Sequence, residues 1–344
     1  MKIKKLPVTL VVLSLALILG GYSAYKEYQK SQIENLKKEE IAKSLNPIFG
    51  EIPAPKVSFV YQSEPNTQFG VSLTPEAQTI YTAPVYKYLN NIKVGEKEAA
   101  MVAQNLKLET TATTQADGSL TFYNKDKSAT LTYWQEYQQF SYYDQSLNFD
   151  LAKPTREGAI LTAKNYLNSF KLESFNLVPD TANIAYKISK GNQYPADGTE
   201  TNYDTIFVPF VRNFGEFKST SLPYHSYLLT MLIGPENRIK NLSLYYVALD
   251  TSRFGTYPLR DVKGAIEDVK NNKGTLVNLQ MPESFYFNLD AVKPKVVSVA
   301  VQQYEIKILD RQNIEYAQPV YVFDGMATLE DGQTVPATYF VPAI

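Results

Sequence analysis

Apolar residues recur with helical spacing in three segments of the chain, and strand-like sequence follows each of them. The apolar positions are Ala99, Val102, Ala103 and Leu106 in the first segment, Ala159, Ala163, Tyr166, Leu167 and Phe170 in the second, and Val262, Ala265, Ile266 and Val269 in the third. Spacings of i, i+3, i+4 and i+7 place such residues on one face of a helix. Pro154 and Pro258 precede the second and third segments, and Gly274 follows the third, as is typical of helix ends. The pattern predicts three helices with one buried face each.

Short runs rich in β-branched and aromatic residues predict antiparallel strands after each helix. The runs are 119–123, 129–134 and 137–142 after the first helix, 184–189, 205–211, 226–233 and 239–248 after the second, and 296–301, 304–309, 319–323, 326–329 and 334–341 after the third. Asp117-Gly118, Asp324-Gly325 and Asp331-Gly332 are typical of hairpin turns. Each helix is therefore expected to precede an antiparallel meander.

The predicted fold class is α+β, with two or three modules in which one helix packs on one antiparallel β-meander. The helices are too unevenly spaced along the chain for a solenoid of fixed period. The expected organisation is a cytoplasmic stub and transmembrane anchor at 1–25, a helical stalk and Pro-rich spacer at 26–55, and modules at 56–150, 151–255 and 256–344.

The anchor is predicted from residues 6–25, which carry no charge. At roughly 1.5 Å per residue, a helix of this length spans the hydrocarbon thickness of a bilayer. Lys2, Lys4 and Lys5 favour a cytoplasmic N-terminus. The localisation predicted is therefore a single-pass membrane protein with residues 26–344 extracytoplasmic. The alternative is a cleaved signal peptide, for which Gly21-Tyr22-Ser23 is the candidate cleavage site.

Charge and composition exclude several classes of function. Residues 44–344 hold 26 basic and 31 acidic side chains, so no basic excess is available to neutralise nucleic-acid phosphates, and no nucleic-acid partner is expected. The chain has no Cys, which excludes thiol nucleophiles, disulfides and Cys-based zinc sites. It has one His, His225, which excludes centres built from several His ligands.

Catalytic patterns are weak throughout the chain. A Ser-His-Asp hydrolase would need His225, yet no Gly-x-Ser-x-Gly motif accompanies it. A glycosidase needs only two carboxylates, and the loop residues Asp144, Asp150, Glu173 and Asp180 are the candidates, although nothing in the sequence pairs them. We therefore predict no enzyme activity, no catalytic residue, no cofactor and no metal site.

The densest aromatic segment is residues 132–144, which contain Tyr133, Trp134, Tyr137 and Tyr142. Such rings stack on sugars or anchor protein interfaces, so these four residues are the candidate ligand or partner surface. In a hairpin, Tyr133 and Tyr137 are expected on one face, and Trp134, Phe140 and Tyr142 on the other, subject to the turn register. The alternative is that one face of the hairpin is core and Tyr residues merely decorate the other.

The last third of the chain carries a resemblance to known families. Tyr257-Pro258-Leu259 opens the third predicted helix, the run 318–323 precedes Asp324-Gly325, and 339–343 reads YFVPA. These residues and the helix-plus-meander pattern resemble the PepSY-like modules of bacterial envelope proteins and the extracytoplasmic regulators YycI and YycH, which are partners of a cell-wall sensor kinase. The resemblance implies a non-enzymatic envelope protein that works by contact, and it transfers no active site.

The leading hypothesis is a single-pass, membrane-anchored, extracytoplasmic protein of the bacterial cell envelope that binds and regulates a protein partner without catalysis. One alternative is a cell-wall glycan (peptidoglycan) binder that uses the aromatic hairpin. The other is a carboxylate-dependent glycan hydrolase.

Overall fold

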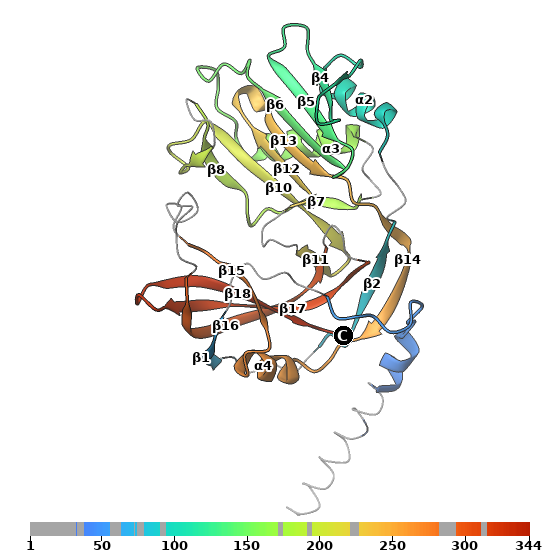
Figure 1. Ribbon diagram of the computed structural model, residues 1–344, viewed down its shortest axis with the longest axis vertical. Coiled ribbons are helices and arrows are strands. Elements are labelled where there is room, and N and C mark those ends of the chain that lie inside the picture. The colour runs from blue at the N-terminus through green and yellow to red at the C-terminus, as the bar shows by residue number, and fades with distance from the viewer. Residues whose placement is uncertain are drawn as a thin grey trace, which may run out of the picture.

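The protein consists of two lobes stacked along its long axis (Figure 1). The computed structural model describes residues 32, 38–55, 63–71, 73, 79–89, 94–170, 175–190, 195–220, 227–281, 294–310 and 315–344. The upper lobe is built mainly from a continuous stretch of chain, residues 94–247, whereas the lower lobe combines residues 63–89 with residues 249–344. The upper lobe is thus inserted between two parts of the lower one.

The upper lobe is an antiparallel sheet covered by two helices. Its elements are α2 (Glu96–Asn105), β3 (Thr113–Thr114), β4 (Leu120–Tyr123), β5 (Ala129–Trp134), β6 (Gln139–Asp144), α3 (Arg156–Ser169), β7 (Leu177–Pro179), β8 (Ala185–Ile188), β9 (Ala196–Asp197), β10 (Thr205–Phe214), β12 (Leu229–Ile233), the 3₁₀ turn η2 (Pro235–Asn237) and β13 (Ile239–Tyr245). The strand order β3-β4-β5-β6-β13-β12-β10 continues to β7 and β8, which both pair with β10.

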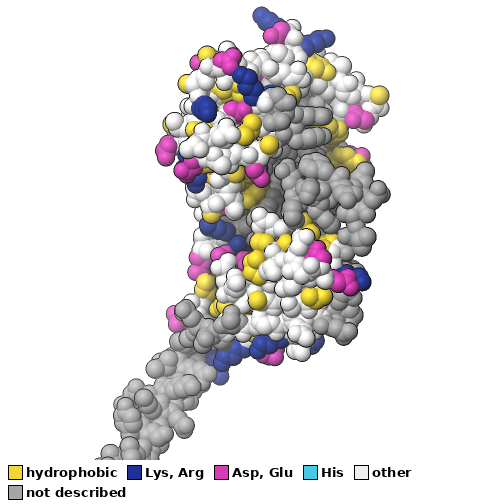
Figure 2. Space-filling model, turned by 90° about the vertical axis from the view of Figure 1, so that its left-hand side faces the viewer, with side chains coloured by type: hydrophobic (Ala, Val, Ile, Leu, Met, Phe, Trp, Pro, Cys, Tyr) yellow, Lys and Arg dark blue, Asp and Glu magenta, His cyan; other side chains and the backbone are white. Residues whose placement is uncertain are grey.

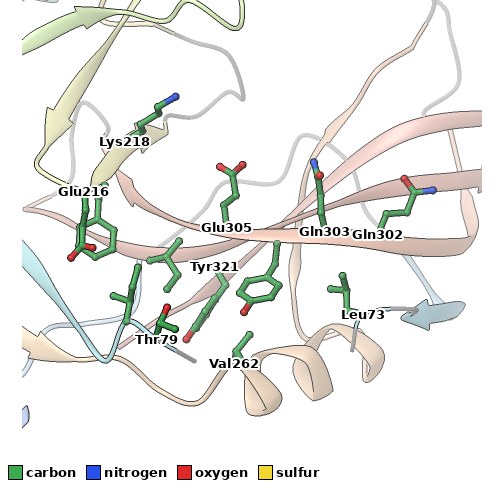
Figure 3. A pocket seen from close by; sticks show the side chains of 13 residues that line it. Leu73, Thr79, Glu216, Lys218, Val262, Gln302, Gln303, Glu305 and Tyr321 are labelled. Atoms are coloured by element: carbon green, nitrogen blue, oxygen red, sulfur yellow. The ribbon is translucent and has the colours of Figure 1, made fainter. Parts of the chain in front are cut away.

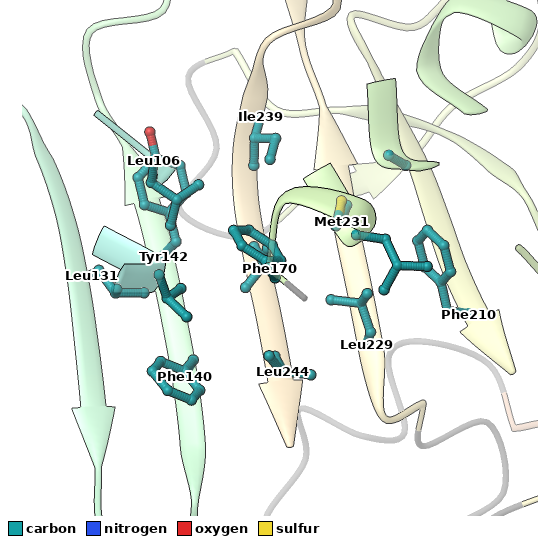
Figure 4. Close-up of a cluster of buried hydrophobic side chains, with 14 of the residues drawn as sticks. Leu106, Leu131, Phe140, Tyr142, Phe170, Phe210, Leu229, Met231, Ile239 and Leu244 are labelled. Carbon is teal, nitrogen blue, oxygen red and sulfur yellow. The ribbon is translucent and has the colours of Figure 1, made fainter. Parts of the chain in front are cut away.

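Both helices of the upper lobe pack on one core. Ala99, Val102 and Ala103 of α2 and Ala159 and Ala163 of α3 are buried in a single cluster with the inward side chains of the sheet. Figure 4 shows this cluster, in which Phe140, Leu244 and Phe170 lie close together. The Thr155 hydroxyl caps α3 by accepting a hydrogen bond from the Gly158 N–H at 3.0 Å. The predicted helices α2 and α3 are therefore confirmed.

The lower lobe is a mixed sheet with one helix against it. Its elements are β1 (Ser63–Val71), β2 (Thr82–Tyr88), β11 (Phe217–Thr220), β14 (Leu249–Pro258), α4 (Val262–Lys270), β15 (Thr275–Leu279), β16 (Val296–Leu309), β17 (Tyr316–Leu329) and β18 (Thr334–Pro342). The strands β16, β17, β18 and β15 are antiparallel neighbours, whereas β1 runs parallel to β16. The predicted third helix is confirmed as α4, which buries Val262, Ala265, Ile266 and Val269.

The predicted fold class, α+β with separate helix-and-meander modules, is wrong. Strands make up 46% of the residues, and the 18 strands of the described part connect into one mixed network. The strand β6 pairs with β13, so the segments 56–150 and 151–255 share one sheet, and residue 255 lies inside β14. A lone meander leaves hydrogen-bonding groups free along its edges, and these edges pair across the expected borders. Hydrophobic periodicity indicates strands without indicating which edges meet.

The predicted turn at Asp324-Gly325 is also wrong, because both residues lie within β17. A Cβ atom on Gly325 would lie 2.1 Å from the Ala300 carbonyl oxygen, so Gly is needed here for close approach of two strands. Asp117-Gly118 and Asp331-Gly332 do form turns, and Gly118 and Gly332 have φ of 79° and 83°.

A membrane-spanning helix is not found among the described elements, since none of the helices there is long and apolar enough to cross a bilayer. The anchor predicted at residues 6–25 lies outside the described residues. On the face shown in Figure 2, Lys and Arg side chains are interspersed with Asp and Glu over both lobes.

Candidate functional site: the open edge of β16

The outer edge of β16 is paired at both ends and open in the middle. The strand β1 pairs with Ser298–Val301 of β16, and β11 pairs with Ile308 and Leu309. Both neighbours run parallel to β16. Between them, residues 302–307 have no strand neighbour on this side within the described part of the chain. At roughly 3.3 Å per residue, the open stretch is about 20 Å long.

Two residues of this stretch direct their backbone groups outward. The Asp310 N–H donates to the Thr220 carbonyl of β11 at 2.7 Å, so Asp310 faces the outer edge. Because strand residues alternate, the backbone groups of Ile306 and Tyr304 face the same way, while those of Glu305 and Lys307 face β17. Within the described residues, no hydrogen bond satisfies the outward N–H and C=O groups of Tyr304 and Ile306.

A hollow of about 670 Å³ lies along this edge. The side chains around it come from β11, β16, β17, α4 and the chain after β1, and they are Leu73, Thr79, Ile80, Glu216, Phe217, Lys218, Val262, Gln302, Gln303, Tyr304, Glu305, Ile306 and Tyr321. The hollow is two-sided: Gln303 and Glu305 point to one side of β16, whereas Tyr321 and Val262 lie on the other (Figure 3). An occupant would therefore meet a polar face and an apolar face.

The apolar face is made of rings fixed by packing and hydrogen bonding. The Tyr304 ring lies 6.2 Å from the Tyr321 ring and 6.0 Å from the Phe323 ring. The Tyr321 hydroxyl donates to the Arg260 carbonyl at 2.7 Å, just before α4 begins. Burial raises the pKa of Tyr321 to about 12, so this phenol stays neutral and keeps its donor. On the polar face, Glu305 pairs with Lys307 at 3.1 Å.

A β-bulge marks where the edge opens. The register between β16 and β17 shifts between Val301 and Gln303, so Gln302 is an additional residue on β16. Bulges increase local twist and end regular pairing. The close approach of Gly325 to Ala300 lies directly beside this bulge. The described pairing of β1 with β16 reaches Val301, directly before this bulge.

The far end of the open stretch is held by a buried junction between the lobes. The Arg212 side chain of β10 is fully buried and donates from Nε to Asp310 at 2.8 Å and from Nη2 to the Val247 carbonyl at 2.9 Å. The Tyr88 hydroxyl donates to the second oxygen of Asp310 at 2.6 Å. The Arg212 N–H donates to Ser219 of β11 at 2.7 Å. This network fixes β11 against the end of β16 and so keeps the edge in a defined geometry.

The four residues of the predicted aromatic surface do not form one surface. Tyr133 is fully buried, stacks on Phe140 at 4.4 Å and donates to the Val94 carbonyl at 2.8 Å. Tyr142 is also buried, and burial raises its pKa further than that of Tyr133, which rises to about 12. Trp134 is half-buried and donates to Asp117 at 3.4 Å, and Tyr137 is 54% exposed.

The turn register explains why the rings separate. Tyr133 pairs with Phe140 and Leu131 pairs with Tyr142 across β5 and β6. Directly paired residues share a face, so Tyr133, Phe140 and Tyr142 all point into the core. The prediction that Tyr133 and Phe140 lie on opposite faces is wrong, because the four-residue connection between β5 and β6 pairs odd positions with even ones.

The candidate carboxylates are held separately by their own partners. Asp144 is buried and accepts from Arg238 at 2.9 Å, Asp150 pairs with Lys190 at 2.6 Å, and Asp180 accepts from Asn183 at 2.7 Å. Lys190 lowers the pKa of Asp150. Glu173 and His225 lie outside the described residues. Within the described part, no group of three or more His, Asp or Glu side chains has the geometry to hold a metal ion.

Sequence reasoning missed the β16 edge. It predicted two strands, 304–309 and 296–301, which the structure joins into one strand through the bulge. The alternation of Tyr304 and Ile306 with charged residues indicated a two-sided strand, yet it carried no information about its neighbours. The outward backbone groups have no residue-type signature.

No protein family, curated protein or solved structure matches the chain. The resemblance to PepSY-like modules and to YycI and YycH therefore stays a prediction.

Proposed function

We propose that this protein is a non-catalytic binding protein that holds an extended segment of a protein partner as an added strand at the open edge of β16. The observation that carries the proposal is the pair of outward-facing residues, Tyr304 and Ile306, whose backbone groups find no partner in the described structure. Adding a strand to an exposed sheet edge is a recurring way of recognising extended peptides.

The shape of the edge favours a single peptide chain over the sheet edge of a second molecule. The described pairing of β1 with β16 reaches Val301, and the pairing of β11 with β16 begins at Ile308, so the open stretch is bounded at both ends. A long sheet edge would collide with these two strands, whereas a peptide of about six residues would fit along about 20 Å. A contact of this kind would let the protein regulate its partner by binding alone.

The two faces of the hollow predict the side-chain pattern of the segment. Residues registered with Tyr304 and Ile306 would point towards Tyr321 and Val262 and would be apolar. Their neighbours would point towards Gln303 and Glu305 and would be polar. The preferred segment therefore alternates apolar and polar residues. Because Asp310 and β11 are fixed by the buried junction, less free energy is lost in ordering the site on binding.

The test is selection of peptides followed by removal of one outward N–H. A phage-displayed library of random peptides is panned on the full chain, and the enriched sequences are synthesised and titrated. Ile306→Pro removes an outward donor without touching a β16–β17 hydrogen bond, and Pro is tolerated in edge strands at such positions. Ile306→Val is the matched control, because it keeps the N–H and a similar side-chain volume.

We expect alternating peptides to be enriched and to bind Ile306→Pro at least about tenfold more weakly than Ile306→Val, which corresponds to about 1.4 kcal/mol. Thermal unfolding of both variants checks that the fold is intact. The proposal is wrong if no alternating peptide is enriched, or if the enriched peptides bind both variants equally.

A further inference from the structure

A second hollow, of about 380 Å³, lies on the other side of the hairpin formed by β10 and β11. Its floor is the ribbon of β2 and β14, and its wall is the hairpin. Glu216 and Phe217 of the hairpin line both hollows, so the hairpin separates the two. Apart from this shared hairpin, the second hollow is lined by other strands than the β16 edge, and it belongs to no function argued above.

The floor and wall of this hollow present a row of three aromatic rings in tilted contact. Phe254 lies directly opposite Tyr86 across β2 and β14, with ring centroids 5.5 Å apart. The Tyr86 ring in turn lies 4.8 Å from the ring of Phe214 in the wall. Phe254 is 46% exposed, so part of its ring is accessible to a ligand. The rings form a platform supported from one side and open on the other.

Uncharged polar groups surround the rings. Thr256 lies next to the platform on β14, opposite Pro84, and Thr82, Thr251 and Asn213 also line the hollow. Within the described residues, the side chains of Thr82, Thr251, Thr256 and Asn213 make no hydrogen bond. Glu216 is the one charged side chain among the described residues of the lining. The lining therefore offers several hydrogen-bonding groups to a ligand and little net charge.

We propose that this hollow binds a neutral oligosaccharide, with one sugar ring on the platform of Phe254 and Tyr86 and its hydroxyl groups on Thr256, Asn213 and Thr82. Flat rings beside amide and hydroxyl groups suit the apolar face and the polar rim of a sugar. A volume of about 380 Å³ falls at the lower end of the range of small-ligand pockets, roughly 300–1,000 Å³.

The observations favour a sugar over a second stretch of polypeptide. An extended peptide needs backbone partners, and the β2 and β14 backbones are paired with each other along the floor. The polar groups are also side-chain hydroxyl and amide groups spread around the rings, which match a ligand with hydroxyl groups on several sides. The aromatic hairpin at Tyr133 lacks this combination, because Tyr133 and Tyr142 are buried.

The experiment titrates the full chain with chitotetraose, cellotetraose and maltotetraose by calorimetry. We expect at least one of these neutral tetrasaccharides to bind with a Kd near or below about 1 mM, a free energy of about 4 kcal/mol. Phe254→Ala should weaken that binding at least about tenfold, and Thr256→Val should weaken it less. Phe254→Trp should retain binding and give a fluorescence change on titration. Because Phe254 is half exposed, these variants are expected to fold, which circular dichroism checks.

Either of two results would overturn the proposal. The first is no binding by any of the three tetrasaccharides with a Kd below about 10 mM, a free energy of about 2.7 kcal/mol. The second is sugar binding that Phe254→Ala leaves unchanged. Loss of peptide binding in Phe254→Ala would instead assign the platform to the protein partner and would also contradict a sugar site. Ile306→Pro should leave sugar binding intact, so the two proposals fail separately.

Discussion

The two lobes differ in how the edges of their strands are paired. In the upper lobe, β6 and β13 pair and join two meanders into one sheet, whose core includes Tyr133, Phe140 and Tyr142. In the lower lobe, the central strand β16 has neighbours at both ends of its outer edge and an open stretch between them. The upper lobe therefore joins its meanders by backbone pairing. In the described part of the lower lobe, the outward backbone groups of Tyr304 and Ile306 have no such pairing.

A dense cluster of aromatic residues in the sequence need not form a surface in the fold. Tyr133 and Tyr142 belong to the richest aromatic segment, yet both are buried. The open edge of β16 is defined by backbone geometry, to which any residue type contributes equally.

The largest loss of stability is expected from a substitution in the buried junction of Arg212 and Asp310, which links the lobes. Arg212→Met leaves the carboxylate of Asp310 buried without its cation, which should lower the free energy of unfolding by about 3–5 kcal/mol. The matched control is Lys87→Met on β2, which breaks the exposed ion pair of Lys87 with Glu315 and should cost less than about 1 kcal/mol. Urea unfolding of both variants measures the difference. Equal losses would show that the junction does not hold the lobes together.

The next largest loss of stability is expected where β16 and β17 approach closely in the lower lobe. Gly325→Ala places a Cβ atom 2.1 Å from the Ala300 carbonyl oxygen, so the strands must shift, at a cost of about 1–3 kcal/mol. Gly70→Ala on β1 is the control, because its nearest neighbour is the Val299 carbonyl oxygen at 3.9 Å. The control should be neutral or slightly stabilising. Thermal unfolding that ranks the two variants the other way round would refute this account of the bulge.

Removal of one buried hydroxyl group in the upper lobe, that of Tyr133, should cause a comparable loss of stability. Tyr133→Phe leaves the Val94 carbonyl without its donor and Gln138 without one acceptor, which should cost about 1–3 kcal/mol. Tyr137→Phe, in the exposed turn of the same hairpin, should cost less than Tyr133→Phe, because water can replace the partner of an exposed hydroxyl group. Chemical denaturation compares the two. A larger loss at Tyr137 would mean that the hairpin faces the other way.

Stability should also depend on alkaline pH. Burial raises the pKa of Tyr133 and of Tyr321 from 10.0 to about 12. Their neutral forms therefore stabilise the fold fully below pH 10, and this contribution is lost as the pH rises through about 12. Stability measured between pH 9 and 12 should fall, and Tyr133→Phe should make the decline shallower. A decline that the substitution leaves unchanged would place the titrating groups elsewhere.

Helices and some turns could be predicted from the sequence, whereas the pairing of distant strands could not. Helical spacing located α2, α3 and α4, and Asp331-Gly332 marked a true turn. Asp324-Gly325 does not form a turn. Gly325 instead allows β17 to approach Ala300 of β16 closely, which depends on the strand register and not on the local sequence. The pairing of β6 with β13 joins residues about 100 positions apart, and no local pattern encodes it.

The candidate site could not be predicted from the sequence either, because it too depends on which strand edges pair. Burial of Tyr133 and Tyr142 follows from the length of one turn. The hollow beside Ile306 lies between the pairing of β1, which reaches Val301, and the pairing of β11, which begins at Ile308. The alternation of Tyr304 and Ile306 with Glu305 was visible, yet an edge strand and a central strand share that alternation.

Hydrogen exchange at the amides of β16 tests the central claim most directly. In the free protein, the Tyr304 and Ile306 amides should exchange fast, whereas the Glu305 amide, which is paired with β17, should be protected. Saturation with an alternating peptide selected on the full chain should slow exchange at Tyr304 and Ile306 at least about tenfold and leave Glu305 unchanged. Binding of that peptide without protection of these two amides would contradict the proposal that the edge of β16 accepts an added strand.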